Sequence, residues 1–383
     1  MSCIYLDHHA TTPMDPRVFA KMEPFFLSQF GNAASQSHPF GWAAEDAVDR
    51  ARIEVASAIN AHPSEIIFTS GATESINMAI KGLFLPVATV PGRHIVTSSI
   101  EHGATKEAIN AVLAAGVSVT TVKPNSAGIV DEESVLSHVQ SDTALVSLFM
   151  VQSEIGSINP IAKMGRALKK CGALFHCDAA QALGRLPIDC QELNVDMMSL
   201  SGHKAYGPKG IGVLYLRRGI FDRICPLMHG GGQEWHKRSG TLNVPGIVGM
   251  GEAARLAAHD FIEDDPRIRA LRDRLMNNLF VLDGVHVNGT LKERVSGNLN
   301  VSFDGIDGEE LILAICQQVA VSTGSACNSY GHGPSKVLEE LGIPKELTQS
   351  SIRFGLGRFT TIEEIDYTSD LIIKHVTLQR QAR

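Results

Sequence analysis

Short apolar runs and segments of helical length alternate along this sequence from about residue 42 to residue 255. The first helical segment, 42–59, places Val48, Ala51 and Val55 on one face. The apolar runs, which we predict to be strands, cover 66–68, 94–96, 117–122, 144–150, 173–177, 195–200 and 211–216. Alternating strands and helices are typical of parallel sheets, because each parallel connection needs a long crossover. We therefore predict an α/β fold with a mostly parallel sheet covered by helices on both faces.

The pattern changes after about residue 258, where a charged helical stretch over 261–280 leads into mixed helix and strand signals. The run 298–303 has the composition of a strand, and a last helix carries Ile365, Ile372 and Val376 on one stripe. A chain of 383 residues is long enough for two domains of roughly 100–200 residues each. We expect an N-terminal arm over residues 1–15 that joins the small domain, a large domain over 16–258, and a small α+β domain over 259–383.

Composition and charge argue against several classes of function. The formal charge is −7, with 44% hydrophobic and 20% charged residues, which is typical of a soluble globular protein. Lys and Arg form no cluster, so direct binding to nucleic acid or to a membrane is not indicated. No apolar stretch approaches about 18 residues. Asp7, His8 and His9 stand where a signal peptide would be apolar, so we expect a cytoplasmic protein.

The seven cysteines are odd in number and form no C-x-x-C pair. This pattern favours free thiols in a reducing compartment over a disulfide framework. The pair His8–His9 and the group Cys171, His176 and Cys177 match no common zinc spacing. We therefore expect no metal site.

The sequence Ser199-Leu200-Ser201-Gly202-His203-Lys204 ends one of the predicted strands. A lysine just past a strand end, among small residues, is partly removed from water. Desolvation disfavours the ammonium form and frees the amine to form a Schiff base. The alternative for Lys204 is a solvated turn lysine.

Another predicted strand ends on Asp178. A fixed carboxylate at such a place would suit pyridoxal phosphate, whose ring nitrogen must stay protonated. A helix cap or an ion pair is the alternative role for Asp178. His102, in the turn after the strand at 94–96, supplies an imidazole that could stack on a planar ring, although a structural role is common for such a histidine.

The turn Ser70-Gly71-Ala72-Thr73 lies between a predicted strand and a predicted helix. Free backbone N–H groups and the helix dipole favour an anion at such a helix start. An ordinary capping box, formed with Glu74, is the alternative.

Together these segments resemble the cysteine desulfurases of the fold-type I, class V aminotransferase group, from Tyr5 to Arg358. The stretches that carry the resemblance are Thr69-Ser70-Gly71-Ala72-Thr73-Glu74-Ser75, Ser201-Gly202-His203-Lys204, Arg238-Ser239-Gly240-Thr241, Gly324-Ser325-Ala326-Cys327 and Ser351-Ile352-Arg353-Phe354. Several long motifs in the same order are very specific, and the resemblance covers nearly the whole chain.

The resemblance implies that pyridoxal 5′-phosphate binds to the large domain, on Lys204 as an internal aldimine. Asp178 would pair with the ring nitrogen, Gln181 would contact the 3′-oxygen and His102 would stack on the ring. The residues that would hold the phosphate are Ala72, Thr73, Ser201 and His203, with Thr241 contributed by a second subunit. This last role implies a homodimer. Arg353 would clamp the substrate carboxylate, which suits its planar fork of donors.

Cys327 distinguishes the reactions within this group. It lies in the Gly/Ser-rich stretch 323–334, which is typical of a loop, whereas an unreactive core cysteine is the alternative. The implied reaction begins when Lys204 moves the α-proton of bound L-cysteine, a step that His102 could assist. The Cys327 thiolate then takes the substrate sulfur as a persulfide and leaves alanine. His332 on the same stretch could act as the base for this thiol.

The sequence departs from the family pattern in two places. Gln152-Ser153-Glu154 stands where the family shows Asn-Asn-Glu, so the amide of Gln152 lies one methylene further out. We predict an altered fit to cofactor and substrate. The sequence also ends soon after its last helix, whereas family members that feed iron–sulfur scaffold proteins often have a longer tail. The sulfur-acceptor protein therefore stays open among iron–sulfur cluster assembly, RNA thiolation and DNA phosphorothioation.

Other functions are compatible with parts of this sequence. A selenocysteine lyase or an aminotransferase could use the same framework, although Cys327 argues against a plain aminotransferase. The run His229-Gly230-Gly231-Gly232 resembles an oxyanion loop, but the chain has no G-x-S-x-G, so a hydrolase is weakly supported. A weakly active sulfur-carrier or docking subunit would bind the cofactor and turn over slowly.

Overall fold

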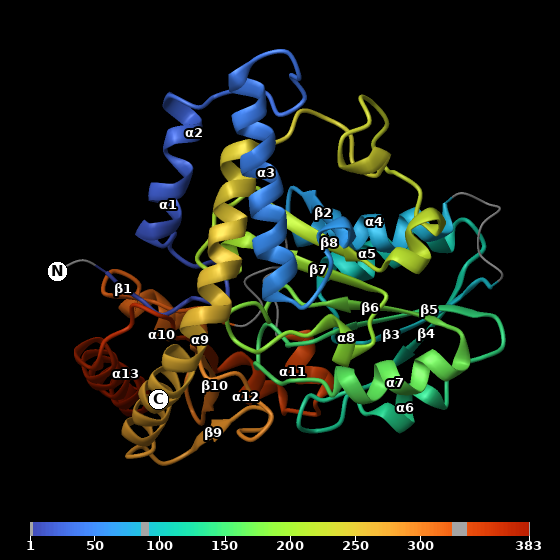
Figure 1. The fold of residues 1–383 in the computed structure, drawn as a ribbon. Coiled ribbons are helices and arrows are strands. Elements are labelled where there is room, and N and C mark those ends of the chain that lie inside the picture. The colour runs from blue at the N-terminus through green and yellow to red at the C-terminus, as the bar shows by residue number, and fades with distance from the viewer. Residues whose placement is uncertain (1–2, 86–91, 324–334, 383) are drawn as a thin grey trace.

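The computed structural model describes residues 3–85, 92–323 and 335–382, and the largest sheet in this part of the chain has seven strands (Figure 1). The strands are β2 (Ile66–Thr69), β3 (His94–Ser98), β4 (Ser118–Val122), β5 (Thr143–Phe149), β6 (Leu174–Asp178), β7 (Met197–Ser201) and β8 (Gly212–Leu216). Their spatial order is β2-β8-β7-β6-β5-β3-β4. The neighbouring strands β4, β3, β5, β6 and β7 pair in parallel, whereas β8 is antiparallel to β7 and to β2. The predicted mostly parallel sheet is confirmed.

Helices cover both faces of this sheet, because successive side chains of a strand point to opposite sides. Ile67 packs with residues of α4 (Ala72–Phe84) and α5 (Gly103–Leu113), whereas Ile66 and Phe68 pack in a second cluster on the other face. This second cluster includes residues of α3 (Pro39–Ala58), α7 (Ile161–Cys171) and α9 (Val244–Leu279). In Figure 1, α4 and α5 lie above the sheet, and α6 (Glu132–Leu136), α7 and α8 (Cys190–Leu193) lie below it. The predicted coverage of both faces is confirmed.

The parallel strands bring four polar segments to one edge of the sheet. Glu101 and His102 follow β3, Gln152 follows β5, Asp178 ends β6 and Ser201 ends β7. The carboxyl ends of neighbouring parallel strands meet at the same edge, and open α/β sheets bind their ligands there. The sheet therefore gathers residues that are far apart in the sequence.

A second core lies beyond the sheet, at the lower left of Figure 1. It is built on an antiparallel sheet of β9 (Val285–Val287), β10 (Asn298–Phe303) and β12 (Ser351–Gly355), with α10 (Gly308–Ile315) and α13 (Ile362–Ala382). α12 (Lys345–Gln349) lies against β10, whereas α11 (Lys336–Glu340) packs Val337 and Leu338 into the first core. In the N-terminal segment, β1 (Ile4–Tyr5) pairs in parallel with β11 (Val319–Ala320), and Leu6 is buried in this second core.

Helix α9 is continuous across the predicted domain boundary at residue 258. Its first half contributes Val244 and Ala257 to the core beside the large sheet, and its second half contributes Leu275 and Leu279 to the second core. α1 (Pro16–Met22) and α2 (Pro24–Leu27) pack on the first half. Short 3₁₀ helices η1 (Pro63–Glu65) and η3 (Arg218–Arg223) flank β2 and β8. No helix within the described ranges is both long and apolar enough to span a membrane.

Candidate active site

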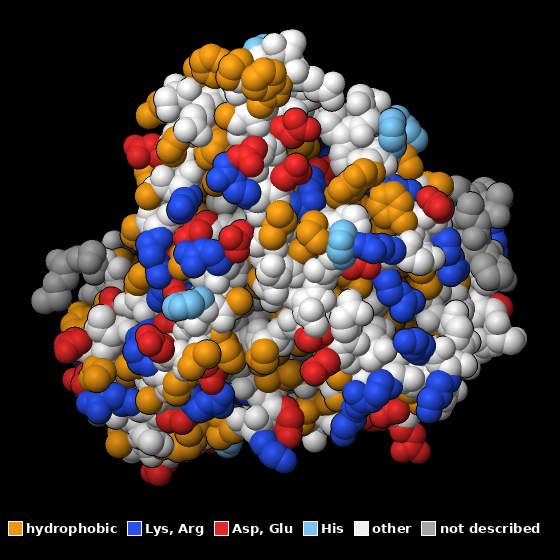
Figure 2. Space-filling model, in the orientation of Figure 1, with side chains coloured by type: hydrophobic (Ala, Val, Ile, Leu, Met, Phe, Trp, Pro, Cys, Tyr) orange, Lys and Arg blue, Asp and Glu red, His pale blue; other side chains and the backbone are white. Residues whose placement is uncertain are grey.

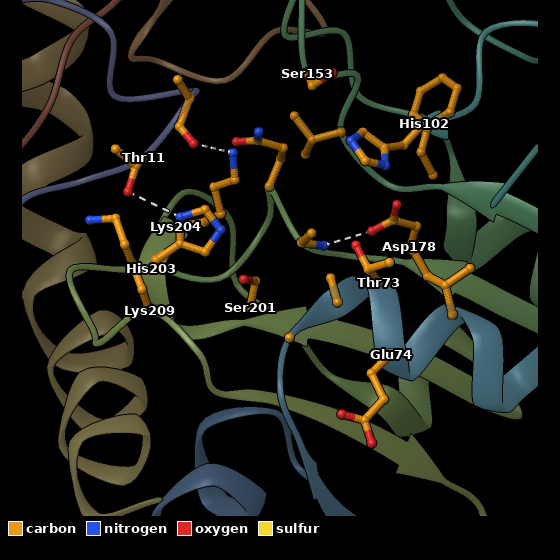
Figure 3. A pocket seen from close by; sticks show the side chains of 18 of the residues that line it. Thr11, Thr73, Glu74, His102, Ser153, Asp178, Ser201, His203, Lys204 and Lys209 are labelled. Atoms are coloured by element: carbon orange, nitrogen blue, oxygen red, sulfur yellow. Dashed lines mark hydrogen bonds between the residues drawn. The ribbon is translucent and has the colours of Figure 1, made fainter. Parts of the chain in front are cut away.

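A cavity of about 570 Å³ lies at the carboxyl ends of the parallel strands (Figure 3). Most of the predicted site residues line it, namely Ala72, Thr73, His102, Gln152, Asp178, Gln181, Ser201, His203 and Lys204. Among the described lining residues, Thr241, Arg353 and the run 229–232 do not occur. Cys327 and His332 lie outside the described residues. The structure thus brings together residues that the sequence spreads over more than a hundred positions.

Lys204 ends the short 3₁₀ helix η2 (Gly202–Lys204), directly after β7. Its Nζ donates to the carbonyl oxygens of His9 and Ala10, each at 2.6 Å. A Cβ at position 202 would lie 2.9 Å from the carbonyl oxygen of Pro208, so this tight turn needs a glycine. The amine is therefore held at the cavity wall by the N-terminal segment, as Figure 3 shows.

Asp178 is buried at the end of β6, and its Oδ1 accepts from the N–H of Ala180 at 3.0 Å. Burial raises the pKa of Asp178, and the nearby His102 and the Ala180 N–H lower it in part. Glu101 lies beside it and accepts from the N–H of Phe149 at 3.1 Å. Burial and then the charge of Asp178 raise the pKa of Glu101 well above its ordinary value. The surroundings therefore favour the neutral form of Glu101, whereas the charged form of Asp178 is favoured by the nearby His102 and Lys204.

The amino end of α4 opens onto the cavity. Its N-cap residue, Gly71, makes no side-chain cap, and its φ of 156° belongs to a backbone region that other residues rarely adopt. Glu74 does not cap α4 either, because its carboxylate accepts from the Ser70 N–H at 2.7 Å and pairs with Arg238 at 2.9 Å. The helix start is therefore suited to an anion rather than closed by a capping box.

Two histidines line the cavity and make different contacts. The Nδ1 of His102 accepts from the Ala104 N–H at 3.1 Å, which makes His102 the N-cap of α5. The Nδ1 of His203 lies 3.0 Å from Oγ1 of Thr11. Burial, together with the charges of Lys204 and its cationic neighbours, lowers the pKa of His203 to about 4. His203 is therefore neutral at pH 7.

The amide of Gln152 closes its own turn. Its Oε1 accepts from the N–H groups of Glu154 at 2.5 Å and Ile155 at 3.1 Å, and its Nε2 donates to the Ile100 carbonyl oxygen at 3.4 Å. The extra methylene thus lets the side chain reach backbone groups while it lines the cavity. The altered fit to cofactor and substrate stays a prediction.

Arg353 lies on β12, next to the cavity, and is 1% exposed. Its guanidinium donates to Oδ1 of Asp7 at 2.8 Å and to the carbonyl oxygen of Ser153, a lining residue, at 3.1 Å. Its Nε is buried without a partner in the described part of the chain. Arg353 also pairs through its backbone with Ser322, just before the residues around Cys327. One N–H of the guanidinium therefore has no described acceptor.

Sequence reasoning missed the contribution of residues 7–12. The sequence pattern assigns none of Asp7, His8, His9 and Thr11 to the site. In the structure, this segment supplies the partners of Lys204, His203 and Arg353. A run of polar residues directly after the short apolar segment Ile4–Leu6 is the signal that could have indicated a buried polar segment. Lys209, which also lines the cavity, had no distinct signal.

The donor set of the cavity fits pyridoxal phosphate. An uncapped helix start with Thr73, Ser201 and a neutral His203 nearby is suited to a phosphate. The buried carboxylate of Asp178 lacks a countercharge at bonding distance among its described partners, and a cationic ring nitrogen would supply one. Lys204 brings an amine to the same cavity.

Comparison with known proteins places the chain in a family. The sequence model of the class-V aminotransferases matches residues 4–368. The chain belongs to the class-V aminotransferase family. It is 49% identical to the "Cysteine desulfurase IscS" of Anaeromyxobacter dehalogenans over 379 residues, which cover 99% of this chain and 93% of that protein. Such likeness within the class-V family confirms the predicted resemblance to cysteine desulfurases.

Solved structures of class-V relatives have the same fold. A NifS-like protein superposes with a TM-score of 0.91 at 36% identity, over 98% of this chain and 100% of that one. A structure described as SspA in complex with cysteine superposes with a TM-score of 0.82 at 33% identity, over 94% of this chain and 100% of that one. The likeness therefore extends through both cores of the molecule.

Proposed function

We propose that this protein is an L-cysteine desulfurase that transfers the sulfur of free L-cysteine to Cys327 and releases alanine. The observation that carries the proposal is the convergence of Lys204 and Asp178 on one cavity beside Arg353. The similarity to proteins described as cysteine desulfurases supports the reaction, and the relative described as bound to cysteine supports the substrate. We keep the cytosolic location that the N-terminal sequence predicts.

Pyridoxal phosphate is the cofactor in this proposal. When bound, it supplies an electron sink for charge that develops on the substrate α-carbon. Lys204 would hold it covalently, and Asp178 would keep the proton on its ring nitrogen. Gln181 would donate to its 3′-oxygen, and His102 would cover the ring. The phosphate would be held by Ala72, Thr73, Ser201 and His203.

The substrate needs an anchor for its carboxylate and a partner for its sulfur. The guanidinium of Arg353, which contacts the lining residue Ser153, would give the carboxylate charge-assisted donors. Lys204 would then move the α-proton, and the Cys327 thiolate would attack the substrate sulfur. An S–S bond forms, the C–S bond breaks with its electron pair on carbon, and that carbon takes a proton. Cysteine and the Cys327 thiol thus become alanine and a Cys327 persulfide, which a sulfur-acceptor protein consumes.

The experiment that tests this function follows visible absorption after pyridoxal phosphate and then L-cysteine are added to the purified protein. We expect a yellow protein, a change of its band with L-cysteine, and equimolar alanine and sulfide in the presence of a thiol reductant. Cys327→Ser should change the band without releasing sulfide. A protein that stays colourless would contradict the cofactor, and a band change without sulfide from the unaltered protein would contradict the reaction. The same assay with selenocysteine distinguishes a selenocysteine lyase, which would act on selenocysteine and not on L-cysteine.

We also propose a homodimer, in which Thr241 reaches the partner's cavity. Thr241 is exposed on the loop before α9, away from its own cavity. Large apolar side chains gather over α2 and the start of α3, at the top of Figure 2. The exposed apolar residues there are Phe26, Leu27, Phe30, Phe40 and Trp42, each more than half exposed. Monomeric proteins rarely expose such a patch, and a second copy could cover it by two-fold symmetry.

The dimer is tested by sedimentation of the variant Leu27→Asp/Phe30→Asp. We expect the unaltered protein to sediment as a dimer and the variant as a monomer, because charges in a buried apolar interface are costly. Leu313→Asp is the control and should stay dimeric, because Leu313 is an exposed residue on α10, at the second core. A monomeric unaltered protein would refute the proposal.

A further inference from the structure

His9 is a buried histidine on the N-terminal segment, 1% exposed, and its backbone carbonyl and its ring contact the same glutamine. The Nε2 of Gln181 donates to the His9 carbonyl oxygen at 2.9 Å. The Nδ1 of the His9 ring lies 3.3 Å from Oε1 of Gln181. Gln181 is itself buried and lines the cavity. One residue therefore contacts both ends of the Gln181 amide.

These two contacts fix the orientation of the amide and the tautomer of the ring. A carbonyl oxygen only accepts, so the end of the Gln181 amide that faces the His9 carbonyl is its NH₂ group. The amide oxygen then faces the ring, and Nδ1 of His9 must carry a proton to donate to it. Without the ring N–H, the amide oxygen would lose its described donor.

The other ring nitrogen of His9 makes the imidazole unfavourable for stability. Its Nε2 is buried and has no hydrogen-bond partner in the described part of the chain. A buried unpaired nitrogen is unfavourable, so an apolar side chain would fill this space better. The ring is also neutral, because burial and the charges of Arg185, Arg353 and Lys204 lower the pKa of His9 well below its ordinary value. The useful group of the ring is therefore the Nδ1–H.

The Gln181 amide has a second N–H beyond the one that donates to His9. We propose that His9 is a positioning residue that locks the Gln181 amide, so that this second N–H is presented to an acceptor oxygen of the cofactor. The inference rests on the proposed cofactor and assigns a role to a side chain that touches neither substrate nor reacting atoms. The His9 carbonyl also accepts from Lys204 at 2.6 Å, but side-chain variants keep that carbonyl and so leave this contact in place.

The test compares His9→Leu with His9→Asn. Leucine and asparagine have nearly the same shape, but only asparagine keeps a donor at the place of Nδ1. We expect His9→Leu to weaken binding of pyridoxal phosphate to the apoprotein about five- to tenfold, the effect of one neutral hydrogen bond, and His9→Asn to stay within about twofold. The pH midpoint of the visible band should rise by roughly half a unit to one unit in His9→Leu, because the 3′-oxygen loses a donor that favours its negative form.

A double-mutant cycle with Gln181→Ala separates positioning from packing. If His9 acts through Gln181, His9→Leu adds no further shift of the midpoint in the Gln181→Ala background. An added shift, or a midpoint that is the same in His9→Leu and the unaltered protein, would overturn the inference. Should His9→Leu fail to fold, His9→Ala, which also lacks the ring donor, decides in both backgrounds by the same criterion. An unaltered protein that binds no pyridoxal phosphate would instead refute the proposed function.

Discussion

Lys204→Ala is expected to abolish turnover of L-cysteine, with a fall in kcat of about 10⁴-fold. Alanine removes both the amine that would hold the cofactor and the group that would move the α-proton. The carbonyl oxygens of His9 and Ala10 would also lose the donor that bridges them, so the change acts on the cavity wall as well. Alanine and sulfide formation, measured at saturating cofactor, checks the effect.

The attachment itself is measured by borohydride treatment followed by peptide mass analysis. We expect the cofactor mass on the peptide that contains Lys204, and no label in Lys204→Ala. Lys209 lines the same cavity and supplies a matched control, because Lys209→Ala should keep the label on Lys204. If the unaltered protein carried the label on Lys209, the assignment of the covalent attachment to Lys204 would be wrong.

The large sheet and the site at its edge could be predicted because both follow from local pattern. Each apolar run gave a strand within about three residues of its observed place, as at β6 and β7. Once these strands are parallel and adjacent, Asp178 and Ser201 must end at the same edge. The convergence of distant residues is therefore a consequence of the sheet and needs no further information.

Helix α9 shows where local pattern fails. The sequence indicated a helix only from about residue 261, whereas α9 begins at Val244. Gly249 and Gly251 lower the helical signal there. In the structure, a Cβ on Gly249 would lie 2.5 Å from Sδ of Met22, and one on Gly251 would lie 2.7 Å from Cα of Ala51. These glycines allow close packing of α1 and α3 on α9, so tertiary contact decides the conformation.

The contacts of the N-terminal segment could not be predicted for a different reason. His9 contacts Gln181, which is 172 positions away in the sequence, and Asp7 contacts Arg353, which is 346 positions away. No periodicity in the sequence encodes which carbonyl oxygen accepts from which side chain. The segment becomes part of the site only because β1 pairs with β11 in the second core and leads residues 7–12 back to the cavity.

Asp178→Asn is expected to lower kcat/KM by roughly 10²- to 10³-fold. An ion pair at contact distance is worth about 4 kcal/mol at an effective dielectric of 20, and part of that is offset by the burial of the charge. A loss of about 3–4 kcal/mol in the transition state corresponds to this fall in rate. The neutral amide keeps the shape of the carboxylate and can still accept from the Ala180 N–H. The change therefore removes the charge and little else, and steady-state kinetics with L-cysteine measure it.

Glu101→Gln is the matched control, because it replaces the neighbouring buried carboxyl group with a neutral group of the same shape. Because burial favours the neutral form of Glu101, we expect kcat/KM to change less than about threefold. Stability gives an independent readout. Folding raises the pKa of Glu101, so between about pH 4.3 and the folded pKa the folded protein holds a proton that the unfolded chain releases. The contribution of Glu101 to the free energy of unfolding therefore falls as the pH rises through this window. Glu101→Gln should make the melting temperature less dependent on pH over that window. Equal losses of rate in Glu101→Gln and Asp178→Asn would mean that the two carboxyl groups share the charge, contrary to the assignment of that charge to Asp178.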